Sequence, residues 1–164
     1  MKRQRKIRDC MKQNVFFVKP DTTVIEAAAV LVERRVGTLP VVDDAGILIG
    51  VTSIKDIIQI FLPDFVSLLS DIDFVKDYGA LAYPSSERLE KVKEMLVTDI
   101  MEEPVGIEDD SSLIKALSVM HKHGVRDLPV LKRGILVGIA SRVDIGRAFL
   151  IDWQITQAEN PEEL

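Results

Sequence analysis

The sequence predicts a mixed α/β protein built from two β-α-β-β-α repeats, and three observations support this. The stretch GVTSIKD at 50–56 returns as GIASRVD at 138–144, with its glycine, serine and aspartate at the same spacing. The residues before each motif also match, over 7–58 and 97–148. A unit of roughly 50 residues has too little core to be stable alone. We therefore expect the two halves to pack face to face with pseudo-two-fold symmetry.

The first elements of each half are a short strand and a helix. The apolar runs at 16–18 and 105–107 predict the strands. Thr23 and Glu26 have the spacing of a capping box, in which two side chains bond each other's backbone N–H at a helix start. Apolar residues then recur on one face of this helix, at Val24, Ala27, Ala28 and Leu31.

The matching helix of the second half has the same periodicity but different ends. Ser112 is followed three residues later by Lys115 instead of an acid, so its capping box is incomplete. Gly124 is a suitable stop, because glycine easily adopts the left-handed conformation that ends many helices. The apolar face consists of Leu113, Ala116, Leu117 and Met120.

A hairpin and a second helix complete each half. The stretches TLPVVDDAGILIGV at 38–51 and DLPVLKRGILVGI at 127–139 each place turn residues between two apolar runs, which predicts a hairpin. We expect Pro40 and Pro129 near a strand start or on a sheet edge, because proline has no N–H to donate. The final helix of each half starts after the serine of the repeated motif.

The repeat also sets the expected domain boundaries. The first repeat, with a basic N-terminal arm, takes 1–60, and the second takes 95–153. Residues 61–94 form an insert that is too apolar for a flexible linker and is partly helical near its end. We expect the insert to pack on its own module; the alternative is a docking face for a partner or a second copy. Residues 154–164 are expected to be a disordered polar tail.

The charge distribution argues against nucleic acid as a partner. The net charge is −5, yet six basic residues fall within the first 12, so the body of the protein is acidic. Nucleic-acid binding over the whole surface would need a basic body. We expect the arm to be solvated and partly frayed. The alternatives are that it contacts phosphates or acidic surfaces, or that it recruits nucleic acid.

Other features bear on the cellular location, on metal binding and on enzymatic activity. No apolar run approaches the ~20 residues of a membrane span, and the single cysteine, Cys10, cannot form an internal disulfide. We therefore expect no membrane contact and a reducing, cytoplasmic location. His121 and His123 do not share a helical face, so no metal site is expected. The sequence contains no motif of a nucleophile or a phosphate-binding loop, and we expect no enzymatic activity.

The repeated S-x-x-D pattern admits two interpretations. At a helix start it is itself a capping box, in which serine and aspartate bond each other's backbone. A helix start also attracts phosphate, and an aspartate there could accept hydrogen bonds from the two hydroxyls of a ribose. Spacing alone favours capping and does not exclude ligand binding.

The ordered series of Asp-x-Met, Leu-Pro-Val, the glycine of the second hairpin strand and S-x-x-D occurs twice. It resembles a tandem pair of cystathionine β-synthase (CBS) domains, called a Bateman module, over 7–60 and 95–150. The resemblance implies a regulatory module that senses an adenosine nucleotide in the cleft between two CBS repeats. AMP is the favoured ligand, ADP, ATP or S-adenosylmethionine are alternatives, and no cofactor is obligatory.

The resemblance also implies a homodimer and a protein partner that the sequence does not identify. The alternative is a structural or interaction module with unoccupied clefts, which docks a protein partner. In that case both S-x-x-D pairs serve only as helix caps.

The resemblance assigns roles to individual residues. The aspartate would hold the ribose, the serine would meet phosphate, and the apolar residue after the glycine would line the adenine slot. Residues before Leu-Pro-Val, such as Gly37, would face the phosphates. Arg126 suits phosphate, whereas Asp127 would repel a polyphosphate if it pointed inward. AMP in the Asp144 site is therefore favoured. The implied binding residues are Val51, Ser53, Asp56 and Thr38 in the first repeat, and Ile139, Ser141, Asp144, Arg126 and Asp127 in the second.

Overall fold

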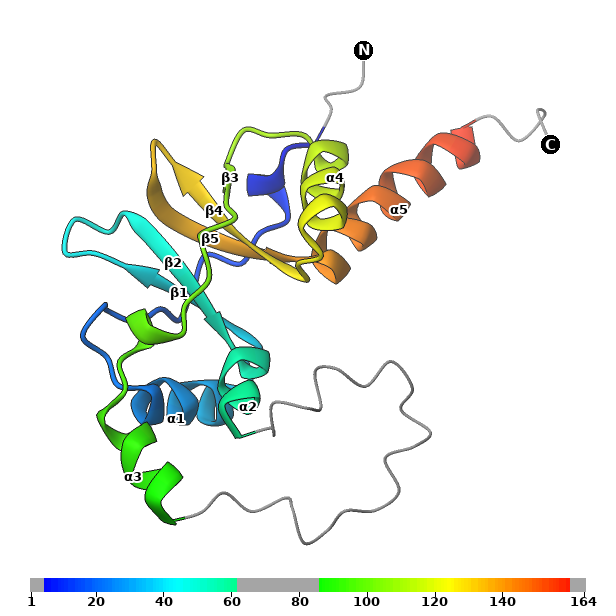
Figure 1. Cartoon of the computed structure of the whole chain (residues 1–164). Helices are drawn as coiled ribbons and strands as arrows, with labels where there is room; N and C mark the ends of the chain where they lie inside the picture. The colour runs from blue at the N-terminus through cyan, green and yellow to red at the C-terminus, as the bar shows by residue number, and fades with distance from the viewer. Residues whose placement is uncertain (1–4, 62–85, 160–164) are drawn as a thin grey trace, which may run out of the picture. The chain divides into compact units, whose positions relative to one another are not determined.

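The structure, a computed structural model, describes residues 5–61 and 86–159 and has the predicted mixed α/β architecture (Figure 1). The chain divides into two compact units, each built mainly on one repeat. We call them the first-repeat unit and the second-repeat unit. The first-repeat unit consists of Phe16–Val41 and Gly50–Glu103, and the second-repeat unit consists of Met1–Val15, Val42–Ile49 and Pro104–Leu164.

The described part of the first-repeat unit contains the α-helices α1, α2 and α3, a 3-10 helix at Val97–Asp99 and most of a two-stranded sheet, β1–β2. Helices α2 and α3 both pack against α1. The core is apolar and includes fully buried residues from α1, β1 and α3. The elements in chain order are α1 (Val24–Arg34), β1 (Thr38–Val42), β2 (Leu48–Ser53), α2 (Ile54–Phe61) and α3 (Ser86–Glu94).

The second-repeat unit repeats this arrangement with one additional short strand. Strand β4 lies between β3, which runs parallel to it, and β5, which runs antiparallel. Helices α4 and α5 pack against each other and against this sheet. The elements are β3 (Ile107–Glu108), α4 (Leu113–His123), β4 (Asp127–Lys132), β5 (Ile135–Ser141) and α5 (Arg142–Glu159).

The predicted helix ends are confirmed. The N–H of Thr23 donates to Oε2 of Glu26 at 2.8 Å, and the N–H of Glu26 donates back to Oγ1 of Thr23 at 3.2 Å. Ser112 caps α4 by accepting from the N–H of Lys115 at 3.2 Å, without a reciprocal acid. Gly124 ends α4 with φ 66°, as expected for a left-handed stop.

The two predicted opening strands are shorter than expected. Residues 16–18 supply only a bridge from Val18 to Val41, and the other strand begins at Ile107 and ends at Glu108. Pro20 cannot donate to a ladder, so pairing does not continue past Val18.

The prolines of the Leu-Pro-Val motifs occupy the third position of their strands. Pro40 lies on an edge strand, as expected, whereas Pro129 lies on the central strand of its sheet. It is opposite Ile139, whose N–H and C=O both bond to the backbone of Lys12. Strand β5 therefore requires no N–H from Pro129, and on the other side β3 pairs with Val130 and Leu131.

The ends of the insert are also defined. Helix α3 confirms the helix predicted near the end of the insert, whereas residues 62–85, on which the docking hypothesis rests, lie outside the described residues. Helix α5 continues to Glu159, so the expected polar tail at 154–164 begins as helix.

The Asp-x-Met segments pack on the unit formed by the opposite repeat. The N–H of Ile7 donates to the carbonyl of Ser111 at 2.9 Å, and the N–H of Val97 donates to that of Thr22 at 2.9 Å. Ile7 and Val97 are both fully buried. Each unit therefore completes its core with the segment that begins the other repeat.

This arrangement corrects the expectation of a frayed basic arm. From Arg5 onward the arm is packed: Nε of Arg5 lies 3.0 Å from Oδ1 of Asp152, and Lys6 forms a bridge with Ser112. Residues 1–4 lie outside the described part. The arm belongs to the second-repeat unit as a structural segment.

The glycine of each repeated motif is explained by the same packing. A Cβ on Gly138 would overlap Sδ of Met11, and a Cβ on Gly50 would overlap Sδ of Met101. In both units, therefore, the motif glycine leaves room for the methionine of an Asp-x-Met segment to pack against its backbone.

Candidate functional site

The S-x-x-D motif of the first repeat lies where β2 ends and α2 begins. The N–H and the hydroxyl of Ser53 both donate to Oδ2 of Asp56, at 2.8 and 2.7 Å. The N–H of Asp56 points back to Oγ of Ser53 at 3.4 Å. This reciprocal pair is a complete capping box.

The second motif has the same geometry where β5 ends and α5 begins. The N–H and the hydroxyl of Ser141 donate to Oδ2 of Asp144, at 3.0 and 2.6 Å. The N–H of Asp144 donates to Oγ of Ser141 at 3.1 Å. The capping interpretation is therefore confirmed in both repeats.

Capping does not use the whole carboxylate. In both motifs the bonds to serine use Oδ2, and Oδ1 of Asp56 and of Asp144 accepts no hydrogen bond from the described residues. A carboxylate offers about four lone-pair sites. Each aspartate can therefore cap its helix and still accept from a ligand hydroxyl.

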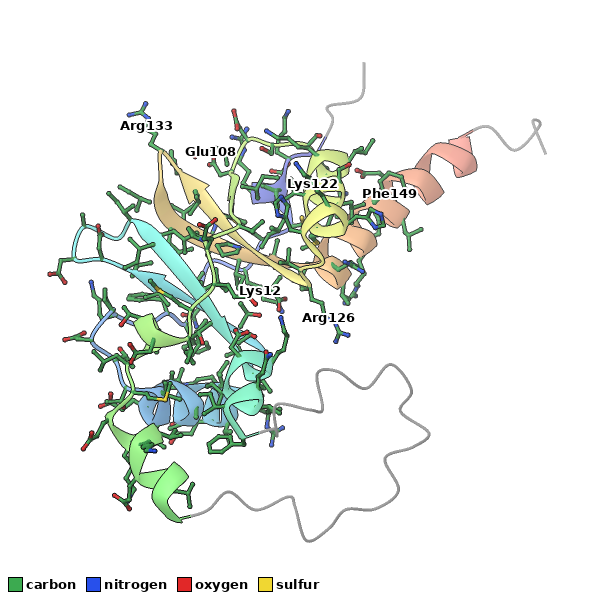
Figure 2. All side chains as sticks on the ribbon, viewed as in Figure 1. Lys12, Glu108, Lys122, Arg126, Arg133 and Phe149 are labelled. Carbon is green, nitrogen blue, oxygen red and sulfur yellow. The ribbon has the colours of Figure 1, made fainter. Side chains whose placement is uncertain are left out.

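Basic residues from three segments lie near the second-repeat motif, and Figure 2 labels two of them, Lys12 and Arg126. Lys12 bonds Ile139 through both backbone groups, at 2.8 and 2.9 Å, and its Nζ lies 3.7 Å from Oδ2 of Asp144. The N–H of Arg142 donates to the carbonyl of Arg126 at 2.9 Å. The ammonium group of Lys12 therefore lies beside Asp144, and the backbones of Arg126 and Arg142 meet at the start of α5.

The first-repeat site has the same backbone contacts with different side chains. Glu102 bonds Val51 through both backbone groups, at 3.1 and 2.9 Å. The N–H of Ile54 donates to the carbonyl of Gly37 at 3.1 Å. Nζ of Lys55 lies 3.1 Å from Oε1 of Glu102 and is held there by an ion pair.

The charge of Asp144 makes stability depend on pH. Burial raises the pKa of this carboxyl, but hydrogen bonds from Ser141 and the charge of Lys12 outweigh burial and hold the pKa below its usual 3.8. The ionised form is therefore favoured in the folded state. Its contribution to stability is complete above pH of about 3.8 and is lost as pH falls through the lower folded pKa.

Urea unfolding at a series of pH values tests this effect with Asp144→Asn. The variant keeps an oxygen acceptor for Ser141 but has no charge to titrate. We expect the wild type to be the more stable protein near neutral pH, and the difference in unfolding free energy to shrink as the pH falls below about 3.8. Parallel curves for the two proteins down to pH 2 would contradict the assignment.

The predicted binding residues gather at corresponding ends of the two units. In the second-repeat unit, Ile139 and Ser141 lie on β5, Asp127 is paired opposite Ser141, and Arg126 precedes β4 and is exposed. In the first-repeat unit the order is the same, with Val51 and Ser53 on β2, Asp56 on α2 and Thr38 at the start of β1.

Sequence reasoning missed Lys12, Glu102 and Arg142. Lys12 and Glu102 each directly follow the methionine of an Asp-x-Met segment, so aligning the repeats pairs them with each other. Their place beside S-x-x-D depends on the backbone bridges to Ile139 and Val51, which local patterns do not reveal.

The described residues contain no cluster of three or more His, Cys, Asp or Glu side chains arranged to hold a metal ion. Among the helices of the same residues, none combines the length and the apolar character needed to cross a membrane.

Comparison with known proteins gives consistent matches. The family model for the CBS domain matches residues 7–63 and 97–151. A CBS domain-containing protein of Dictyostelium discoideum is 32% identical over 141 residues, covering 85% of this chain and 87% of that protein. The chloroplastic CBS domain-containing protein CBSX2 of Arabidopsis thaliana is 34% identical over 149 residues, covering 85% of this chain but 60% of CBSX2.

Solved structures show the same fold. The crystal structure of CBSX2 in complex with AMP superposes with a TM-score of 0.66 at 32% identity, covering 92% of this chain and 98% of that one. Another crystal structure of CBSX2 from Arabidopsis thaliana gives a TM-score of 0.71 at 29% identity, covering 93% and 99%.

Proposed function

Because this chain belongs to the CBS domain family, we propose that it is a regulatory module that binds an adenosine nucleotide at its S-x-x-D helix starts. AMP is the ligand that we favour, since it is the molecule bound in the CBSX2 complex. ADP, ATP and S-adenosylmethionine are the alternatives to test. The proposal assigns no catalytic role to any residue.

The observation that carries the proposal is the unused oxygen of each motif aspartate. Oδ2 of Asp144 is occupied by the cap, whereas Oδ1 accepts nothing from the described residues. Oδ1 is thus available to a ribose hydroxyl. The half-buried Ile139 lies two residues before Ser141 on the same side of β5 and can provide an apolar wall for the base.

Regulation follows if the ligand prefers one conformation of the module. A ligand shifts an equilibrium only by its difference in affinity for the two states. In our proposal a partner protein, or a second copy of the chain in a homodimer, recognises the favoured state. The proposed setting is cytoplasmic.

Chemical unfolding with and without nucleotide tests the function. A ligand at about 100 times its dissociation constant should add about 2.7 kcal/mol to the free energy of unfolding. We expect AMP to produce this effect, and we expect Asp56→Ala combined with Asp144→Ala to abolish it, because both ribose acceptors are lost.

A matched control separates ligand binding from helix capping. Ser112→Ala removes the cap of α4, which has no S-x-x-D motif, and should cost about 1 kcal/mol of stability while the response to AMP is kept. No stabilisation of the wild type by any of the four ligands would favour the alternative, an interaction module whose aspartates only cap helices.

A further inference from the structure

The two sites carry different charges at two pairs of equivalent positions, and the second-repeat site also carries Asp127 opposite Ser141. Resting on the proposed function, we infer that they take different ligand classes. The second-repeat site takes a phosphorylated adenosine ligand, and the first-repeat site takes an adenosine ligand without phosphate. Matching backbone hydrogen bonds in the two units identify which residues occupy equivalent positions.

The first pair of equivalent positions is Lys12 and Glu102. Each forms an antiparallel bridge with the apolar residue of its motif, Ile139 or Val51, through two backbone hydrogen bonds. The side chain beside the motif is therefore an ammonium group in one unit and a carboxylate in the other. At this position alone the two sites differ by two units of charge.

The second pair of positions lies at the helix start. In the second-repeat unit, the N–H of Arg142 donates to the carbonyl of Arg126; in the first-repeat unit, the N–H of Ile54 donates to the carbonyl of Gly37. The two arginines of one unit thus correspond to isoleucine and glycine in the other, so two guanidinium groups are replaced by a sec-butyl group and a hydrogen atom. Nη2 of Arg142 is anchored by the carbonyl of Val125 at 3.2 Å, which keeps its charge near the motif.

Among the described residues, the cation recorded beside the first-repeat motif is Lys55, and it is already paired with Glu102. The hydrogen bond and the charge of Glu102 raise the pKa of Lys55 and hold its ammonium group. A phosphate approaching this site would meet the carboxylates of Asp56 and Glu102 and would have to compete with Glu102 for Lys55. A neutral nucleoside, which needs only the free carboxylate oxygen and an apolar wall, would avoid this competition.

In the second-repeat unit, a phosphate at the start of α5 would instead meet Lys12, whose Nζ lies 3.7 Å from Oδ2 of Asp144, and Arg126, whose carbonyl accepts from the N–H of Arg142. Arginine is suited to phosphate because its planar guanidinium can donate two parallel hydrogen bonds. A hydrogen bond to a charged group contributes enough to change affinity by about tenfold or more.

Calorimetric titration with AMP and adenosine tests the inference, because the two probes differ only in the phosphate. Asp56→Ala leaves the second-repeat site intact, and Asp144→Ala leaves the first. We expect the Asp56→Ala protein to bind AMP at least about tenfold more tightly than adenosine. We expect the Asp144→Ala protein to bind adenosine at least as tightly as AMP. If alanine impairs folding, asparagine at the same position keeps an acceptor for the cap.

Charge exchange then identifies the residues responsible. In the Asp56→Ala protein, Lys12→Glu should lower the AMP-to-adenosine affinity ratio by about tenfold or more. Lys132→Glu is the matched control, because it makes the same charge change at the exposed far end of β4. In the Asp144→Ala protein, Glu102→Lys should raise the ratio.

The outcomes separate the two proposals. Equal ratios at the two sites, a first-repeat site that binds neither probe, or equal effects of Lys12→Glu and Lys132→Glu would overturn the inference about charge. Failure of the wild type to bind either probe would overturn the proposed function itself.

Discussion

Replacing Ile7 with alanine is expected to lower the free energy of unfolding by about 2–5 kcal/mol, the usual cost of removing a large buried aliphatic side chain. Ile7 is fully buried in the core of the second-repeat unit, beside residues of α4, β4 and β5. The backbone of the segment is already fixed by the bond from Ile7 to Ser111, so little relaxation is available to fill the cavity. Urea unfolding followed by circular dichroism measures the loss.

Arg8→Ala is the matched control for this prediction. Arg8 is the next residue of the same segment, and its side chain is exposed, so the change should alter the unfolding free energy by less than about 0.5 kcal/mol. A comparably small effect of Ile7→Ala would mean that the N-terminal segment is not part of the core.

Gly138→Ala is expected to destabilise the protein by about 1–3 kcal/mol, because it inserts a methyl group into filled space. The new Cβ would overlap the side chain of Met11 and would lie 3.1 Å from the carbonyl oxygen of Lys12. The methionine can move, but the carbonyl oxygen is held by the N–H of Ile139 at 2.9 Å. Thermal or urea unfolding measures the cost.

A second glycine, Gly146, provides a control for which the expected change in unfolding free energy has the opposite sign. Gly146 lies inside α5, and a Cβ added there meets nothing within 4 Å. Gly146→Ala should therefore raise the unfolding free energy by about 0.5–1 kcal/mol, because alanine is the better helix former. If both alanine variants were more stable than the wild type, the contact with Met11 would not require glycine at position 138.

Features set by neighbours in sequence were predictable. The capping box of Thr23 with Glu26, the stop at Gly124 and the two hairpins depend on residues a few positions apart, and the structure confirms each of them. The repeat made the fold class predictable as well, because two copies of one element series need each other to bury a core.

Features set by distant contacts were not predictable from local patterns. The apolar run at 16–18 satisfies a strand pattern but finds only a single bridge, at Val18. The basic character of the arm suggested a solvated end, whereas Ile7 within it is fully buried. Lys12 and Glu102 enter the candidate site through bridges to residues more than 50 positions away along the sequence. The spacing of residues within one segment does not indicate which distant residues that segment contacts.

The packing of each Asp-x-Met segment on the opposite repeat has a consequence for dividing the protein. A fragment that starts at residue 95 would carry Val97, whose buried environment belongs to the first-repeat unit, and would lack Ile7. The complementary fragment, which ends at residue 94, would have the reverse deficiency. Neither half would have a complete core, so the two fragments should associate when they are mixed.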